Sequence, residues 1–448
     1  MNELKGIAQE LLKAAQAAGA EDVIADVVDT TVNQIRFSNR RIDVSNWWNE
    51  KHAVMFVAVG DRTISTDLRN LERASEAARA VVELAKRSPR NKNYFGIASG
   101  RFKYVRSRAD KQIVNLRDPS RFVHDAIRGA ESEGAIDVGG TMFVRREGRA
   151  IATTGGALGV DEAASIDLSV RAFSQAEASG HSLCCTSRLS GLKAKEAGQR
   201  AGELARKARD PVQGEEGKFD IIMEPLLLGS LVNSTSMMMT ALRVEIGTSM
   251  FANKIGERVA SKEVTFVDDP TVDSISRRAY DHEGVPTRRN VVIKDGVLKT
   301  YLHNTSTAKK FKTKTTANAG PLVPTLFTLA NQPVPFHCVL VPGDWKVEEM
   351  IADTKNGLYV NNTWYTRYQN YGTGDFSTIP RDAILRIENG EITGPVKNVR
   401  VSDNMLNLWK SIDAISRDAQ EVLWWEEATP PTTLPFTRAR NMNITRSA

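Results

Sequence analysis

The sequence predicts an α+β protein of two domains, each with a mixed or antiparallel sheet and packed helices. Its 448 residues exceed what one hydrophobic core usually serves. Segments with helical periodicity alternate with groups of short runs that are typical of strands. A polar stretch with one proline and two glycines, residues 211–218, follows a long predicted helix and is the best linker candidate. We therefore expect an N-terminal domain over 1–213 and a C-terminal domain over 214–448.

The N-terminal half begins with a predicted helix over 4–18, in which apolar residues recur every three to four positions until Gly19. Further helices are expected over 67–87, after Asp118-Pro119, and over 191–209. The strand-like runs between them cover residues 22–28, 31–37, 52–59, 63–65, 161–173 and 181–187. Residues 139–154 are expected to form a hairpin that turns at 146–148.

The C-terminal half opens with a predicted strand over 219–223. Pro225 then begins an apolar helix over 225–242. The remainder is expected to form mostly short strands separated by Gly, Pro and Asp, with an irregular, loop-like stretch over 359–376.

Composition excludes several protein classes. Hydrophobic residues make up 41% and charged residues 25% of the chain, which excludes wholesale disorder, collagen and coiled coil. The three cysteines form no disulfide framework, which is typical of a reducing compartment. The first segment carries Glu3 and Glu10 and is not a signal peptide, and no run of about 18 apolar residues predicts a membrane span. We expect a cytoplasmic protein without membrane contact.

Positive charge is concentrated in one segment. The formal net charge is +6, and residues 86–117 hold ten lysines and arginines against one acid, Asp110. Aromatic residues are interleaved there, and such a pattern can hold a single strand of nucleic acid by charge and stacking. The alternative is a long basic connection packed on its own domain, and we expect that alternative.

Common catalytic motifs are missing. The six histidines are too far apart for a zinc helix of the HExxH kind, and there is no Walker loop, GxGxxG or GxSxG. His282-Glu283 is an isolated pair in a predicted turn. His337 and Cys338 are neighbours on a predicted strand and point to opposite faces, so they cannot act as a nucleophile–base pair.

Aromatic residues gather in residues 359–376. We expect four of them to line a groove for an extended peptide, namely Trp364, Tyr365, Tyr368 and Tyr371. The alternative is packing in a core or an interface.

The C-terminal half resembles the TldD/PmbA family, whose members are sometimes labelled modulators of DNA gyrase. The resemblance rests on a series of segments in a fixed order: VTFVDDPT (264–271), YDHEGVPT (280–287), VVIKDGVLKTYL (291–302), TAK (307–309), GTGDFS (372–377) and IENGEITGPV (387–396). It implies a two-domain α+β fold and a dimer that encloses a peptide channel. It also implies proteolysis of peptides or unfolded segments, including peptide maturation.

The resemblance further implies that catalytic, TldD-type members hold zinc with a HExxxH helix and a later cysteine, whereas TldE-type members lack these ligands. In this sequence the corresponding positions are Asn233, Ser234 and Met238, and residues 423–431 contain no cysteine. Amide, hydroxyl and thioether groups do not provide the ligands that zinc requires. We therefore expect no catalytic residue and no metal or other cofactor in this chain.

These observations predict the non-catalytic, TldE-type subunit of a heterodimeric zinc metalloprotease that degrades or matures peptides and unfolded segments. The zinc is expected in a TldD-type partner, and this chain would hold extended substrate by strand addition. It could also form a homodimer when alone. Two alternatives remain: a self-sufficient homodimeric peptidase that uses unrecognised residues, and a nucleic-acid-associated regulator. Nucleic acid is the less expected partner.

Overall fold

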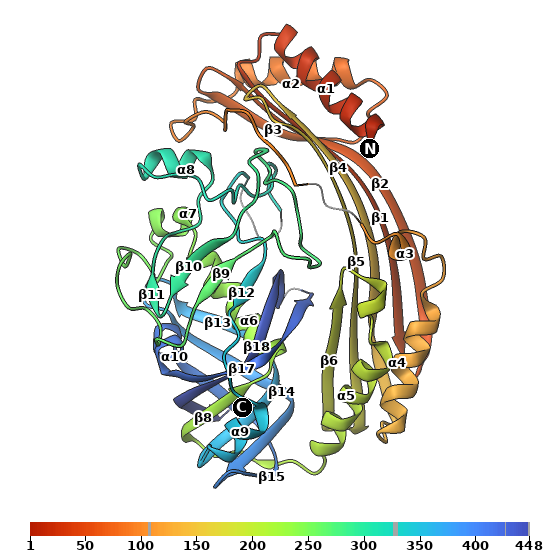
Figure 1. Cartoon of the computed structure of the whole chain (residues 1–448), viewed down its shortest axis with the longest axis vertical. Coiled ribbons are helices and arrows are strands. Elements are labelled where there is room, and N and C mark those ends of the chain that lie inside the picture. Colours follow the sequence, from red (N-terminus) through yellow and green to blue (C-terminus); the bar gives the residue numbers. More distant parts are fainter. Residues whose placement is uncertain (106–108, 326–329, 426, 447–448) are drawn as a thin grey trace.

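The computed structural model describes residues 1–105, 109–325, 330–425 and 427–446. A long, curved sheet formed by the N-terminal half bends around the C-terminal half, which lies on its inner side (Figure 1). The two sheets and their helices confirm the predicted α+β class. No helix in the described part of the chain is long and apolar enough to cross a membrane.

The first sheet is antiparallel and has the strand order β3-β2-β1-β4-β5-β6. Its strands are β1 (Asp22–Ser38), β2 (Arg41–Val59), β3 (Arg62–Leu68), β4 (Asp137–Thr153), β5 (Leu158–Gln175) and β6 (Ala178–Thr186). The hairpin expected over 139–154 is wrong, because β4 runs straight through residues 146–148. These residues pair with β1 on one side and with β5 on the other, and two complete ladders outweigh a local turn preference.

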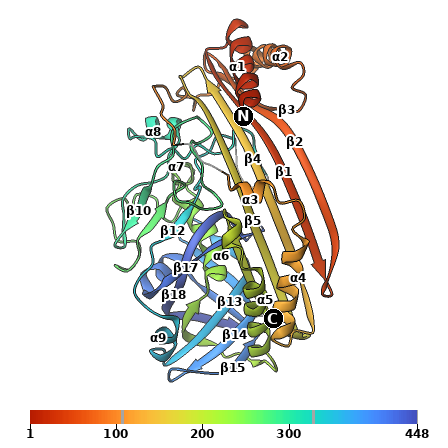
Figure 2. The ribbon, with the colours of Figure 1, turned by 45° about the vertical axis from the view of Figure 1, so that its right-hand side comes forward.

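Helices cover the outer face of this sheet at both ends (Figure 2). They are α1 (Asn2–Ala17), α2 (Ala74–Arg87), α3 (Lys111–Val114), α4 (Ser120–Ser132) and α5 (Ala194–Lys207), with a 3-10 turn at Leu189–Gly191. On β1, Val27 packs with α1 and α2, and Ile35 packs with α4 and α5. Because alternate residues of a strand share a face, the even-numbered Ile24 and Asp26 point toward the C-terminal half. The helix expected from residue 67 begins only at Ala74, since β3 extends to Leu68.

The second sheet has the main order β11-β10-β9-β12-β18-β8-β13-β14-β15-β7, with β16 between β14 and β18, and β17 beside β18. Its shorter strands are β7 (Val212–Gln213), β8 (Gly217–Met223), β9 (Phe266–Asp268), β10 (Asn290–Lys294), β11 (Val297–Leu298), β12 (Cys338–Leu340), β15 (Glu391–Lys397) and β16 (Val399–Asn404). Its long strands are β13 (Asn356–Asn370), β14 (Asp375–Glu388), β17 (Ile412–Trp424) and β18 (Ala428–Arg446). Strand β7 already belongs to this sheet, so the sheet begins two residues before the boundary predicted at 214; the division into domains stays a prediction.

The C-terminal helices are short. They are α6 (Pro225–Met238), α7 (Ala241–Glu245), α8 (Thr305–Lys310), α9 (Val347–Ala352) and α10 (Met405–Ser411). Helix α6 is buried along almost its whole length, and Leu227, Leu228 and Leu231 share the main core with strands β8 and β13. The loop-like stretch expected over 359–376 is wrong, because most of it is the β13–β14 hairpin.

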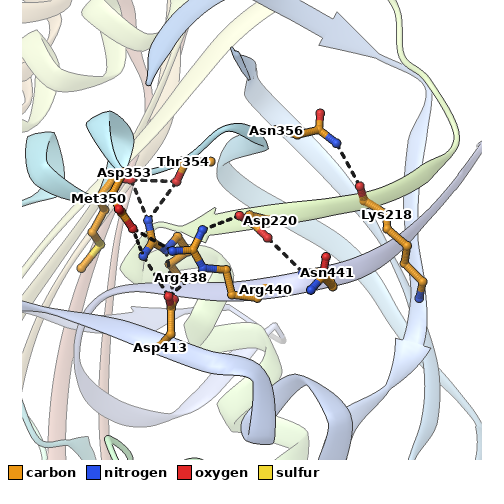
Figure 3. A network of polar contacts seen from close by, with 10 residues as sticks. All are labelled: Lys218, Asp220, Met350, Asp353, Thr354, Asn356, Asp413, Arg438, Arg440 and Asn441. Carbon is orange, nitrogen blue, oxygen red and sulfur yellow. Dashed lines mark hydrogen bonds and ion pairs between the residues drawn. The ribbon is translucent and has the colours of Figure 1, made fainter. Parts of the chain in front are cut away.

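An arginine network ties α9, β8, β17 and β18 together (Figure 3). Arg438 is buried and makes five hydrogen bonds. Two go to the Asp413 carboxylate (3.0 and 2.9 Å), one to Asp353 (2.7 Å), and two to the Met350 carbonyl and the Thr354 hydroxyl (3.0 and 3.1 Å). All five guanidinium N–H groups are therefore used. This network joins α9 to strands β17 and β18 of the second sheet.

Candidate functional site

A turn of the C-terminal half, residues 281–285, docks on the inner face of the first sheet. The Asp281 carboxylate accepts hydrogen bonds from the backbone N–H groups of Glu283 (3.0 Å), Val285 (2.9 Å) and Ala319 (3.0 Å). Gly284 has a φ of +81°, which favours glycine, and a Cβ there would lie 2.5 Å from that of Ala157. The turn that the sequence indicated at His282-Glu283 is thus fixed from within and held close to the sheet.

A buried ion pair on β1 and β4 receives this turn. Arg149 and Asp26 form a salt bridge, and Nδ1 of His282 lies 3.1 Å from Arg149 Nη2 and 3.4 Å from Asp26 Oδ2. Nδ1 can accept from Arg149, which places the imidazole proton on Nε2, or donate to Asp26, which places it on Nδ1. Burial and the Arg149 charge lower the pKa of His282 to about 4, so it is neutral at physiological pH. Although burial opposes the charge, Arg149 and His282 hold the pKa of Asp26 well below its usual range.

Arg278 opens onto a pocket beside this pair. Its guanidinium carbon lies 4.2 Å from the centre of the Phe336 ring, and Nη1 is buried with no hydrogen-bond partner. The pocket has a volume of about 400 Å³. Its lining is mostly apolar and consists of Met237, Ile275, Ser276, Arg278, His282, Pro321, Thr325, Val334, Pro335, Phe336, Thr429, Pro430 and Pro431. The described surface therefore combines an apolar cavity with one cation, which suits a small ligand that carries a negative group.

The same pocket reaches the end of α6 where the family resemblance places the metal ligands. Asn233 accepts a hydrogen bond from the Thr429 hydroxyl (2.9 Å), Met238 is buried in the core, and Ser234 lies between them on α6. An amide, a hydroxyl and a buried thioether do not fit zinc. In the described part of the chain, no three His, Cys, Asp or Glu side chains form a group that could hold a metal ion.

The four aromatic residues predicted to bind peptide lie on the β13–β14 hairpin and its turn. Trp364 stacks on Tyr365 with a centroid distance of 5.3 Å, and Tyr368 stacks on Tyr371 at the same distance. Neighbours on a regular strand point to opposite faces, so the first stack depends on the bulge after Trp364, where Tyr365 has a φ of +58°. Tyr365 and Tyr371 are exposed. The pocket at Arg278 contains none of the four, and their role in peptide binding stays a prediction.

A second polar cluster joins the two halves and leaves little unsatisfied. Asn361 accepts from the backbone N–H of His181 (2.9 Å) and donates to Glu224 (2.7 Å), and Glu224 also accepts from Arg200 (2.7 Å). The His181 ring contacts Ser169 Oγ (2.8 Å) and Asn362 Nδ2 (3.0 Å). Burial lowers the pKa of His181 to about 3. This cluster joins the N-terminal and C-terminal halves of the chain through hydrogen bonds.

The basic segment over 86–117 is packed against both halves. Tyr104 donates to the Gly284 carbonyl (2.7 Å), and Tyr94 packs on Phe56 with a centroid distance of 5.5 Å. Lys309 of α8 donates to the Phe95 carbonyl (2.6 Å). Residues 106–108 lie outside the described residues. Tyr94 and Tyr104 are thus engaged inside the fold, whereas Phe95 is exposed. Whether the segment meets nucleic acid stays a prediction.

Sequence analysis did not single out Asp26, Arg149 or Arg278. The sequence does contain a signal for Asp26, because this residue interrupts the otherwise apolar run 23–28. A lone carboxylate in such a strand needs a buried partner. Its partner Arg149 comes from a strand 123 positions later, so the pair could not be found by local reading. Cys338 is buried, and burial raises the pKa of its thiol.

A sequence model of the family described as the PmbA/TldA metallopeptidase C-terminal domain matches residues 216–446, about half of the chain. A metalloprotease from Methanothermobacter thermautotrophicus is 32% identical over 228 residues, which cover 50% of this chain and 48% of that protein. A metalloprotease from Methanocaldococcus jannaschii is 34% identical over 207 residues, which cover 45% and 44% of the two chains. The matched region thus spans about half of the length of these curated relatives.

The whole chain has a close structural counterpart. The crystal structure of TldE from Thermococcus kodakarensis superposes with a TM-score of 0.87, and the match covers 98% of this chain and 100% of that one. The sequence identity is 19%, so this likeness concerns the fold alone.

Proposed function

Because the chain belongs to the PmbA/TldD metallopeptidase family, we propose that it is the non-catalytic, TldE-type subunit of a two-subunit metalloprotease. A TldD-type partner carries the zinc and its chemistry, and this chain binds peptide or unfolded protein substrate. The single observation that supports the proposal is the composition of α6. It carries Asn233, Ser234 and Met238 at the positions where the family resemblance expects metal ligands in catalytic members.

The pocket supports a substrate-holding role. Its walls come from the end of α6, from the loop before β12 and from the start of β18, and Arg278 supplies a positive charge. These groups can bind and orient a peptide and exclude water from it. The unpaired cysteines fit our further proposal of a cytoplasmic location.

The decisive experiment is co-expression with a HExxxH-bearing family member, followed by size-exclusion chromatography, metal counting and a peptide cleavage assay. We expect a heterodimer with one zinc per pair and cleavage by the pair only. The lone chain should bind no zinc stoichiometrically and cleave nothing. One tightly bound zinc per lone chain, together with cleavage by it, would overturn the proposal.

A substitution on α6 of this chain serves as a control and tests whether Met238 takes part in the reaction. The substitution of Met238 by Leu keeps the volume and the burial of this side chain, so assembly and cleavage by the pair should stay unchanged. If the variant abolished cleavage while the complex still formed, Met238 would have a direct role in the reaction, against the proposal.

A further inference from the structure

Arg278 is a buried cation that forms no direct ion pair in the described part of the chain. The carboxylates of Glu147, Asp161 and Asp26 attract it from a greater distance, but burial and the Arg149 charge outweigh them and lower its pKa. Its side chain makes no hydrogen bond or ion pair there, and its contact is the ring of Phe336. The neighbouring Arg149 does not compete for a ligand, because Asp26 already neutralises it. Among the described residues that line the pocket, Arg278 is the one arginine or lysine, and burial disfavours its charge.

The residues that line the pocket around Arg278 restrict which other groups of a ligand can bind there. Four of these residues are prolines (Pro321, Pro335, Pro430 and Pro431). Proline has no backbone N–H, so these positions cannot donate hydrogen bonds to a substrate backbone as a sheet edge would. Met237, Val334 and Phe336 add apolar surface. The pocket thus accepts an apolar side chain but leaves most buried peptide groups without partners.

We propose that this pocket binds the free carboxyl terminus of a peptide whose last residue is apolar, with Arg278 on the carboxylate. The assignment rests on the proposed peptide-holding role and names the part of the peptide that this chain holds. A terminal residue carries its carboxylate and its side chain on one α-carbon, which suits a cation beside an apolar wall. An internal Asp or Glu would bring peptide groups on both sides into a surface that offers them few partners.

His282 is a second, uncharged polar group of the pocket and lines it together with Arg278. In the tautomer in which Nδ1 accepts from Arg149, its Nε2 proton can be donated to a ligand. Arg278 and His282 come from one loop, which Asp281 and Gly284 fix through the turn described above. The donors are therefore held in place before the peptide binds, which reduces the entropy lost on binding.

The test is a binding titration on the full chain without a partner subunit. Two fluorescein-labelled octapeptides of identical sequence end in leucine, one as the free acid and one as the carboxamide, and binding is followed by fluorescence anisotropy. We expect the acid to bind at least about tenfold more tightly than the amide, as a charge-assisted hydrogen bond in a desolvated site provides. A third peptide, which ends in glycine as the free acid, should bind more weakly than the leucine peptide.

Two arginine variants form a matched pair. R278M removes the cation and should reduce the preference for the acid to less than about twofold. R277M makes the same change of charge one residue earlier, at a side chain that does not line this pocket, and should keep the full preference. If R278M does not fold, R278Q gives the same readout with a polar replacement.

Equal binding of acid and amide by the wild type, or an unchanged preference in R278M, would overturn the assignment. Displacement of the peptide by millimolar inorganic phosphate as readily as by unlabelled acid would overturn it as well, since the site would then be one for any anion. A chain that shows no preference but assembles with a HExxxH-bearing partner refutes only the terminus site. A chain that shows the preference but does not assemble refutes only the proposed subunit role.

Discussion

Arg438 and Arg278 both lie in the C-terminal half and both stack over an aromatic ring, yet their guanidinium groups are in opposite states. Arg438 lies 5.3 Å from the Trp345 ring and donates five hydrogen bonds, two of them to Asp413 (Figure 3). Arg278 lies 4.2 Å from the Phe336 ring and donates none to the described residues. The chain supplies hydrogen-bond acceptors for all five N–H groups of Arg438, whereas the described residues supply none for the Arg278 side chain.

The difference separates a structural charge from a binding charge. Burying a cation is costly unless hydrogen bonds and an opposite charge offset the lost hydration. For Arg438 the fold supplies both, so the residue holds the sheet together. For Arg278 the described residues supply no hydrogen bond and no direct ion pair. The more distant Glu147, Asp161 and Asp26 leave its pKa below the ordinary value, so a ligand carboxylate would offset the remaining cost. Four predictions test this contrast, in order of decreasing effect.

The largest effect is expected for R438M. Methionine keeps much of the volume but leaves the Asp413 carboxylate without its main buried partner, and the Met350 carbonyl loses its donor. We expect the free energy of unfolding to fall by about 3–5 kcal/mol, as measured by urea denaturation. A loss below about 1 kcal/mol would show that the five hydrogen bonds of Arg438 contribute little to the stability of the fold.

The second effect concerns the histidine beside Arg278. The His282 pKa is lowered to about 4, against ~6.5 for an exposed imidazole. Between these values the unfolded chain binds more protons than the folded one, so this contribution to stability is complete above pH 6.5 and is lost as the pH falls toward 4. From pH 7 to pH 4, the wild type should lose about 3 kcal/mol relative to H282Q, in which that titration is absent.

Urea denaturation at a series of pH values measures this difference, and other titrating groups cancel in it. H124Q, a change of an exposed histidine on α4, serves as the control and should follow the wild type. Parallel curves for the wild type and H282Q would mean that His282 is not buried in neutral form next to the pocket.

The third effect is smaller and concerns the two carboxylates, Asp353 and Asp413, that both pair with Arg438. Asp353 binds both Arg438 and Arg440 at 2.7 Å, but its side chain is 52% exposed. D353N keeps an oxygen acceptor, and Asp413 still pairs with both arginines. We expect a loss of at most about 1 kcal/mol in the free energy of unfolding. A loss as large as that of R438M would mean that the ion pairs of Asp353 account for the contribution of this network to the free energy of unfolding, and that the other hydrogen bonds of Arg438 do not.

The N-terminal half shows how much could be predicted from the sequence. Alternating apolar residues identified strands such as β1, because one face of each is buried beneath helices. The continuation of β4 through Gly148 could not be predicted, since its two neighbouring strands, and not its own residues, keep it extended. The Asn233, Ser234 and Met238 positions came from the family resemblance alone. No local pattern distinguished Arg278 from other arginines, because what defines it is the absence of partners in three dimensions.

The smallest effect, and the sharpest contrast with R438M, is expected for R278M. Methionine leaves no carboxylate or carbonyl of the described chain without a donor, and it removes the cost of a partly buried charge. The lost stacking on Phe336 is offset by apolar contact with the same ring. The free energy of unfolding should therefore stay within about 1 kcal/mol of the wild-type value in urea denaturation, with R277M as the matched control for net charge. A loss of 3 kcal/mol or more would place Arg278 with Arg438 among the structural arginines. Unchanged stability together with a lost preference for the peptide acid would instead mark Arg278 as a charge that the fold keeps for a ligand.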